Sequence, residues 1–173
     1  MSTAKKSDAK GLEMLQKLTL QDLSSVTEAL NFLREKGKAH YLKSVFESLK
    51  GSDRAKQQLI IGFLSDILDS DAVPEFIDFL GTETDAEIRK LVLSAIWNSK
   101  LGFDEHLPFF VMLASQGDYL EALDCLTVLE NVSGPFEEAQ LLEAQLLLKE
   151  YLEEKAPQTD FLRRNQIRKK VKP

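Results

Sequence analysis

The chain has 173 residues, of which 43% are hydrophobic and 29% charged, a composition typical of one soluble globular domain. Five prolines and eight glycines supply little turn punctuation, which argues against a β-sandwich. The single cysteine, Cys125, excludes an internal disulfide and fits a reducing compartment. Since no stretch approaches the roughly 18 apolar residues of a membrane span and the first residues lack the apolar segment of a signal peptide, we expect a cytoplasmic protein.

The net charge of −6 is unevenly distributed along the chain. Residues 155–173 contain seven Lys or Arg and one Asp, a net charge of +6, so residues 1–154 carry −12. An acidic body argues against a broad nucleic-acid surface, because phosphate binding depends on basic contacts. The basic segment could still bind phosphates, an acidic protein or the protein's own acidic body, or it could be solvated without a partner. Its candidate residues are Arg163, Arg164, Arg168, Lys169, Lys170 and Lys172.

Apolar residues recur at intervals of three and four almost throughout the chain, which predicts helices. Residues 1–8 are expected to form a flexible N-terminus, followed by a helical domain over residues 9–154 and the basic tail over residues 155–173. About nine short helices are expected, the last of them ending near Leu152. The sequences that divide them are Lys36-Gly37, Gly51-Ser52-Asp53, Asp69 to Asp71, Gly81-Thr82, Gly102, Gly117-Asp118 and Ser133-Gly134-Pro135.

The predicted helices follow one internal repeat of paired helices. The pair around Phe76 and Ile88 aligns with earlier pairs 31 and 62 residues before it, and with a later pair 34 residues after it. Only Gln57 is polar among the aligned core positions, and the expected N-cap residues Asp22, Asp53, Thr84 and Asp118 keep the same register. The aligned positions are Met14, Leu15, Leu18, Val26, Ala29, Leu30, Leu33, Val45, Phe46, Leu49, Gln57, Ile60, Ile61, Leu64, Phe76, Ile77, Leu80, Ile88, Leu91, Val92, Ala95, Phe110, Val111, Ala114, Ala122, Cys125, Leu126 and Leu129.

This pattern resembles the HEAT-repeat family and the wider armadillo-type α-solenoids. Besides the paired helices, the matching features are Pro74 and Pro108 in first helices and an Asp85-x-x-Ile88-Arg89 sequence at the start of a second helix. The resemblance covers about residues 9–152. It implies an all-α, right-handed superhelix of about four HEAT-like hairpins plus a closing helix, with the second helices on the concave face.

The repeats depart from the family in two respects: their units of 31 to 34 residues are shorter than the roughly 40 residues usual for this class, and the family's ladder of Asp and Arg residues is missing. Members often carry an Asp and an Arg in each unit, stacked as this ladder, whereas the positions equivalent to Arg89 are Thr27, Gln58 and Leu123. Families with this fold mostly bind proteins and some bind nucleic acids, but the fold alone does not fix the function.

Few residues of this chain suggest catalysis or metal binding. His40 and His106 each open a first helix, and neither has a Cys, Asp or Glu at metal-ligand spacing on a shared helix face, so exposed positions at helix starts are expected. Cys125 occupies a core position and is expected to be a buried, inert thiol. The sequence contains no Gly-rich phosphate loop, no Gly-x-Ser-x-Gly and no His-Glu-x-x-His. We therefore expect no enzyme activity, no cofactor and no metal.

The main candidate for a binding surface is a group of three apolar residues, Leu93, Ile96 and Trp97. Their aligned positions in the other units are mostly polar or small, which predicts an exposed apolar patch centred on the only tryptophan. Asp66 and Glu130 are expected to flank this patch. The alternative is that Trp97 packs inward against residues 107–112. Arg89 likewise has two interpretations: a structural bond to the neighbouring repeat, or a contact with a ligand.

Together these features predict a non-catalytic scaffold or interaction module that binds an unidentified protein on the concave face. The alternative is a nucleic-acid-associated protein that uses the basic tail. These alternatives differ in their response to salt, because phosphate binding weakens steeply as the salt concentration rises. The sequence leaves the oligomeric state open.

Overall fold

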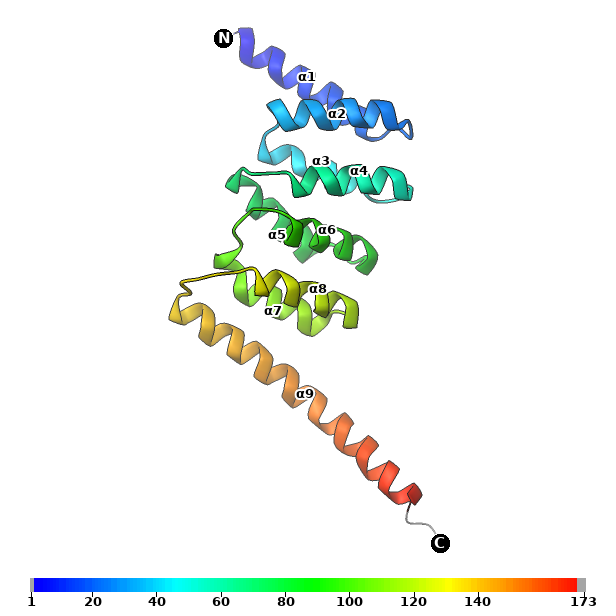
Figure 1. Ribbon diagram of the computed structural model, residues 1–173, viewed down its shortest axis with the longest axis vertical. Coiled ribbons are helices and arrows are strands. Elements are labelled where there is room, and N and C mark those ends of the chain that lie inside the picture. Colours follow the sequence, from blue (N-terminus) through cyan, green and yellow to red (C-terminus); the bar gives the residue numbers. More distant parts are fainter. Residues whose placement is uncertain (1, 171–173) are drawn as a thin grey trace.

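The computed structural model describes the backbone of residues 2–170 and the side chains of residues 9–155, and this part of the chain is helical with no strand (Figure 1). The expected all-α class is therefore confirmed for the described residues. Three short 3-10 turns, Ala39–Tyr41, Ser70–Ala72 and Asp104–His106, precede α3, α5 and α7. The α-helices are α1 (Ser2–Leu18), α2 (Leu23–Lys36), α3 (Leu42–Glu47), α4 (Arg54–Ser65), α5 (Val73–Thr82), α6 (Ala86–Asn98), α7 (Leu107–Gln116), α8 (Tyr119–Glu130) and α9 (Glu138–Lys170).

The helices lie in two rows that follow the order of the chain (Figure 1). In one row α2 packs on α4, α4 on α6 and α6 on α8; in the other, α1 packs on α3 and α3 on α5. Helix α1 also packs on α2, and α7 packs on both α8 and α9. Short connections join the two helices of each pair, as is usual for antiparallel neighbours. We refer to α2, α4, α6 and α8 as the second-helix row.

Aspartate side chains fix the start of every helix in the second-helix row. Asp22 accepts hydrogen bonds from the backbone N–H groups of Ser24 and Ser25, and Asp53, Asp85 and Asp118 cap α4, α6 and α8 in the same way. Three of the four expected N-caps are confirmed, but Thr84 is wrong. The Glu83 carboxylate accepts hydrogen bonds from the N–H groups of Thr84 and Asp85, which places Thr84 in the turn before the helix.

The core follows the repeat register. Every aligned core position is buried or half-buried except Leu126, whose exposed fraction is 49%. Phenylalanine rings connect successive units inside this core: Phe46 contacts Phe76, Phe76 contacts Phe103, and Phe103 contacts Phe110, with ring centroids 5.1, 6.1 and 5.8 Å apart. These edge-to-face contacts are a favoured geometry for aromatic pairs.

The two ends of the chain differ from the sequence prediction. Helix α1 begins at Ser2, and α9 continues through Lys170 instead of ending near Leu152. Residues 155–170 contain six Lys or Arg, which favour helix, and the segment prolongs α9 beyond the rest of the molecule (Figure 1). The side chains of the candidate basic residues, Arg163 to Lys172, lie outside the described part. Among the helices of the described residues, none combines the length and apolar character needed to cross a membrane.

Candidate partner-binding surfaces

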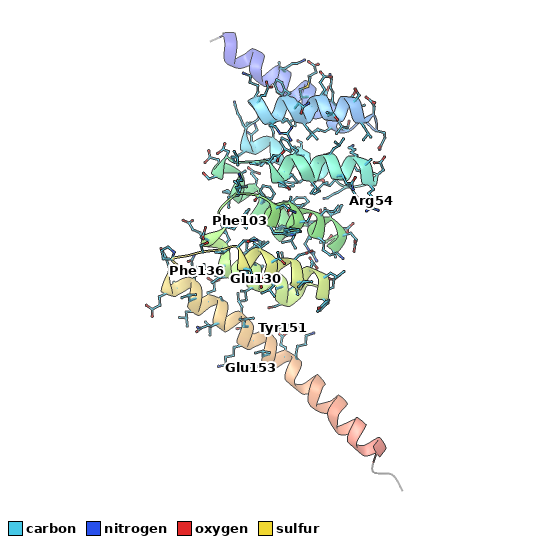
Figure 2. The ribbon with its side chains drawn as sticks, in the orientation of Figure 1. Arg54, Phe103, Glu130, Phe136, Tyr151 and Glu153 are labelled. Atoms are coloured by element: carbon cyan, nitrogen blue, oxygen red, sulfur yellow. The ribbon has the colours of Figure 1, made fainter. Side chains whose placement is uncertain are left out.

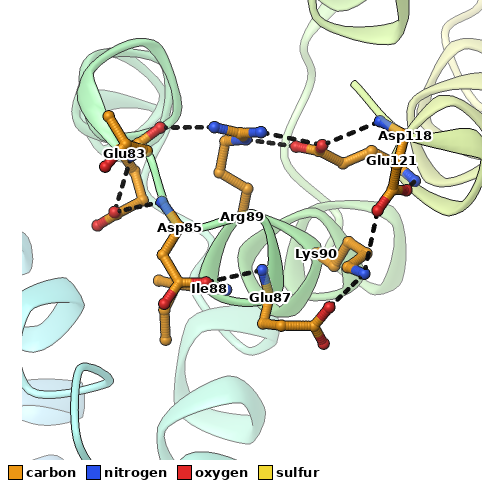
Figure 3. Close-up of polar contacts among 9 residues, drawn as sticks. Glu83, Asp85, Glu87, Ile88, Arg89, Lys90, Asp118 and Glu121 are labelled. Carbon is orange, nitrogen blue, oxygen red and sulfur yellow. Dashed lines mark hydrogen bonds and ion pairs between the residues drawn. The ribbon is translucent and has the colours of Figure 1, made fainter. Parts of the chain in front are cut away.

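Arg89 joins the third helix pair to the fourth. Its guanidinium lies against the carboxylate of Glu121 on α8: Nε donates to Oε1, and Nη2 donates to Oε2 at 2.9 Å (Figure 3). Nη1 donates to the backbone carbonyl of Glu83 at 2.9 Å. The Glu121 carboxylate is buried and also accepts from the N–H of Asp118, which completes the capping box of α8. The hydrogen bonds to Glu121 raise the pKa of Arg89 above its ordinary value.

The position of Arg89 supports the structural interpretation. The guanidinium donates to three protein oxygens, and only 18% of the side chain is exposed. Other units use different residues for the same purpose. Lys50 forms an ion pair with Glu83 of the next unit at 2.9 Å, and the buried Lys56 donates to the carbonyl of Leu20 in the preceding unit at 3.0 Å. Polar contacts between units are therefore present, although the repeated Arg is not.

The predicted three-residue apolar patch is wrong for two of its members. Leu93 and Ile96 are core residues, 0% and 3% exposed, because α8 packs directly on α6. Only Trp97 reaches the surface, with an exposed fraction of 38%. Asp66 and Glu130 are exposed as expected, and Asp66 forms an ion pair with Arg34 at 2.9 Å.

Trp97 lies at a cavity of about 540 Å³ between the ends of α6 and α8. Apolar lining comes from Ile96, Phe103 and Val128, and polar lining from Lys100 and Asn131. The linkers after α6 and α8 form the rest of the wall. The N–H of Ser133, in the linker after α8, donates to the carboxylate of Asp104, in the linker after α6, at 3.2 Å. A volume of this size and an indole at its edge suit one or two side chains of another molecule.

A second cavity, of about 460 Å³, lies at the same edge of the second-helix row, between the ends of α2 and α4. Arg34 and Asp66 line it together with Phe63, and the guanidinium carbon of Arg34 is 5.8 Å from the centre of the Phe63 ring. Most of the remaining lining is apolar, including Leu42 and Leu68. The second-helix row thus offers two cavities, one between the ends of α2 and α4 and the other between the ends of α6 and α8.

The outer side of α8 is an apolar surface that the sequence interpretation missed. Leu120, Leu123 and Leu126 are 55%, 47% and 49% exposed, and α9 beside α7 adds exposed leucines, of which Leu148 and Leu152 are 47% and 65% exposed. Glu130 and Glu153 lie on these same two helices (Figure 2). A comparison of Leu123 with Arg89 at the aligned position could have indicated this surface, because an apolar residue replaces the charged contact to a following unit.

The remaining candidate groups are the thiol of Cys125 and the imidazoles of His40 and His106. Burial raises the pKa of the Cys125 thiol to about 12, and the carboxylates of Glu121 and Asp124 act in the same direction. His40 is exposed as expected, whereas His106 is half-buried, and burial lowers its pKa. No group of three or more His, Cys, Asp or Glu side chains with metal-binding geometry occurs within the described residues.

Comparisons with protein-family models, curated proteins and solved structures give no match to this chain.

Proposed function

We propose that the protein is a non-catalytic interaction module, similar in architecture to HEAT-repeat α-solenoids, that binds a protein partner along the second-helix row. The single observation that carries this proposal is the exposed edge of Trp97 at the 540 Å³ cavity between α6 and α8. Tryptophan is enriched at the energetic centres of protein interfaces, where it fills or borders a pocket on the partner. A reducing compartment such as the cytoplasm suits the single buried thiol.

The arrangement of helices supports a solenoid of about four hairpins with α9 as its closing helix. Each helix of the second-helix row packs on the next, and polar contacts at Lys50, Lys56 and Arg89 join successive units. A row of this kind presents a continuous surface to a partner, as helical-repeat proteins generally do. The second cavity at Arg34 and Asp66 lies on the same row and extends the surface toward the N-terminal units.

A photo-crosslinking amino acid placed at position 97 tests the proposal. Because Trp97 is partly exposed at the cavity, we expect a photo-crosslinker at this position to label one defined protein in the source cells. The matched control places the same group at Lys43, an exposed residue of α3 in the other row. Labelling of the same protein from both positions, or of no protein from position 97, would contradict a binding surface at Trp97.

A further inference from the structure

The outer side of α8 corresponds to a surface that is covered one unit earlier. At the aligned positions of α6, Val92 is fully buried and Ile96 is 3% exposed, because α8 packs on them. In α8 the equivalent residues, Leu126 and Glu130, are exposed. Within the described part of the chain, α8 makes its extensive contacts with α6 and α7. The next position of the second-helix row, on the outer side of α8, is therefore open to a helix from elsewhere.

Helix α9 likewise exposes residues whose aligned positions on the preceding first helix, α7, are covered. It packs on α7 and thereby occupies the first-helix position of a fifth unit. The offset of 34 residues aligns Val111 and Ala114 of α7, which are buried or half-buried, with Gln145 and Leu148 of α9, which are exposed. A shallow groove of about 380 Å³ runs over this side of α9, beside Leu148, Leu152 and Glu153. The missing second helix of the fifth unit would lie here, antiparallel to α9 and beside α8.

The charge around this position defines what kind of helix fits it. Residues 118–154 contain ten Asp or Glu and one Lys, a net charge of −9. Glu130, Glu150 and Glu153 are all exposed on α8 and α9. A helix that covers the leucines must therefore place basic residues close to these carboxylates, since unlike charges favour the encounter and like charges oppose it.

The second half of α9 has the required sequence. Residues 155–170 contain six Lys or Arg and one Asp, together with Phe161, Leu162 and Ile167. In this structure the segment continues α9 away from the other helices of its own chain (Figure 1). The acidic part of α9, residues 138–154, and the basic part, residues 155–170, have almost the same length, so two antiparallel copies of α9 that cross near Lys155 would place Arg164 and Lys170 of one copy near Glu143 and Glu138 of the other.

We propose that a second copy of this chain supplies the missing helix. In the resulting two-fold dimer, the basic half of each α9 lies antiparallel on the acidic half of the other and covers the outer side of the other copy's α8. The contact is self-complementary, as a two-fold interface requires. This proposal does not depend on the binding surface at Trp97, because it uses the opposite side of α8 and the projecting half of α9.

Charge reversal on each half tests the dimer by sedimentation velocity at low salt. The wild-type chain is expected to be dimeric. Both the acidic-side variant (Glu130→Lys, Glu138→Lys, Glu143→Lys), whose three residues are exposed, and the basic-side variant (Arg163→Glu, Arg164→Glu, Arg168→Glu) are expected to be monomeric. A control variant reverses Glu13, Glu35 and Glu47, which are exposed on α1, α2 and α3. It has the same change in net charge as the acidic-side variant and is expected to remain dimeric.

Mixing the two monomeric variants is the decisive measurement. In the mixed dimer the reversed acidic half of one variant meets the reversed basic half of the other, and the two unchanged halves meet each other. Equimolar mixing is therefore expected to restore a dimer that neither variant forms alone. Circular dichroism of each variant checks that its helices are intact. A wild-type chain that is monomeric at every soluble concentration, a mixture that stays monomeric with both variants folded, or a dimer that persists after removal of residues 155–173 would each overturn the proposal.

Discussion

The contact between Arg89 and Glu121 shows how a single residue can join two successive helix pairs. Both oxygens of the buried carboxylate accept from the guanidinium, and one of them also belongs to the capping box at the start of α8. Loss of either partner leaves a charge in a place from which water is largely excluded. Such loss is far more costly than loss of an exposed ion pair.

Replacement of Arg89 is therefore expected to destabilise the protein strongly. Arg89→Ala leaves the Glu121 carboxylate buried without its cation, which costs about 3 kcal/mol, the lower end of the range for buried pairs because Arg89 keeps some exposure. The neighbouring Lys90→Ala removes ion pairs to the exposed Glu87 and Asp118 and should cost much less than Arg89→Ala. Urea denaturation of the two variants measures the difference. Equal losses would show that the buried carboxylate does not need its cation.

Cys125 is expected to be unreactive in the folded protein. The thiol is buried and its pKa is raised to about 12, so almost no thiolate is present at neutral pH. Reaction with a thiol reagent such as Ellman's reagent should be slow in native buffer and complete at once in denaturant. Rapid reaction of the native protein would instead indicate that α8 opens readily, or that the thiol has a chemical role.

At the scale of single helices, the neighbouring residues Thr84 and Asp85 have different roles at the start of α6. Asp85 accepts hydrogen bonds from the N–H groups of Glu87 and Ile88, whereas Thr84 lies one position before the cap. Asp85→Ala should cost about 1 kcal/mol of stability, because two orphan donors lose their acceptor. Thr84→Ala should change stability by less than about 0.5 kcal/mol, as is usual for exposed positions without such a role. Thermal melting followed by circular dichroism compares them, and a larger effect at Thr84 would place the cap where the sequence register had it.

Periodicity predicted the helices and most of the core, because a residue's place on a helix face depends mainly on its own sequence. It could not predict which neighbouring helix covers that face. Leu93 and Ile96 looked like an exposed patch because Thr127 and Glu130 are polar at the aligned positions. The difference arises because α8 covers α6, while no helix in the described residues covers the outer side of α8 in the same way.

Burial of Leu93 leads to a prediction at the scale of helix packing. Leu93→Ala removes a fully buried side chain between α6 and its neighbours and should cost about 2 to 5 kcal/mol. Leu126→Ala, on the exposed side of α8, should cost much less, since about half of that side chain already faces water. Denaturation midpoints measured in the same buffer compare the two. The proposed dimer would cover Leu126, so both substitutions are made in the monomeric acidic-side charge-reversal variant. Similar losses in that background would mean that Leu126 is covered within a single chain.

At the scale of the whole molecule, charge and apolar surface are divided between two regions. The second-helix row has cavities at Trp97 and at Arg34, whereas the net charge changes sign within α9, from the acidic residues before Lys155 to the basic residues after it. These regions suit different kinds of contact. An apolar side chain that enters a cavity is little affected by salt, while contacts between opposite charges are screened beyond about 10 Å at 0.1 M salt.

Removal of residues 155–173 is the change that distinguishes partner binding on the second-helix row from nucleic-acid binding by the basic tail. The shortened chain loses a net charge of +6 and the proposed dimer contact but keeps the part of α9 that contains the buried Ala144 and the half-buried Tyr151. Its melting temperature should therefore match that of the monomeric basic-side charge-reversal variant. The partner protein captured through position 97 should still bind the shortened chain, with an affinity that changes little between low and moderate salt. Phosphate binding by the tail would instead disappear on truncation, and in the full chain it would fall steeply with salt, with a slope set by the number of phosphates contacted.

Fluorescence of the single Trp97 follows protein binding on the second-helix row without a label, and the anisotropy of a labelled oligonucleotide follows nucleic-acid binding by the tail. Loss of the Trp97 signal on truncation, together with a steep salt dependence, would contradict the proposed function and assign binding to the tail.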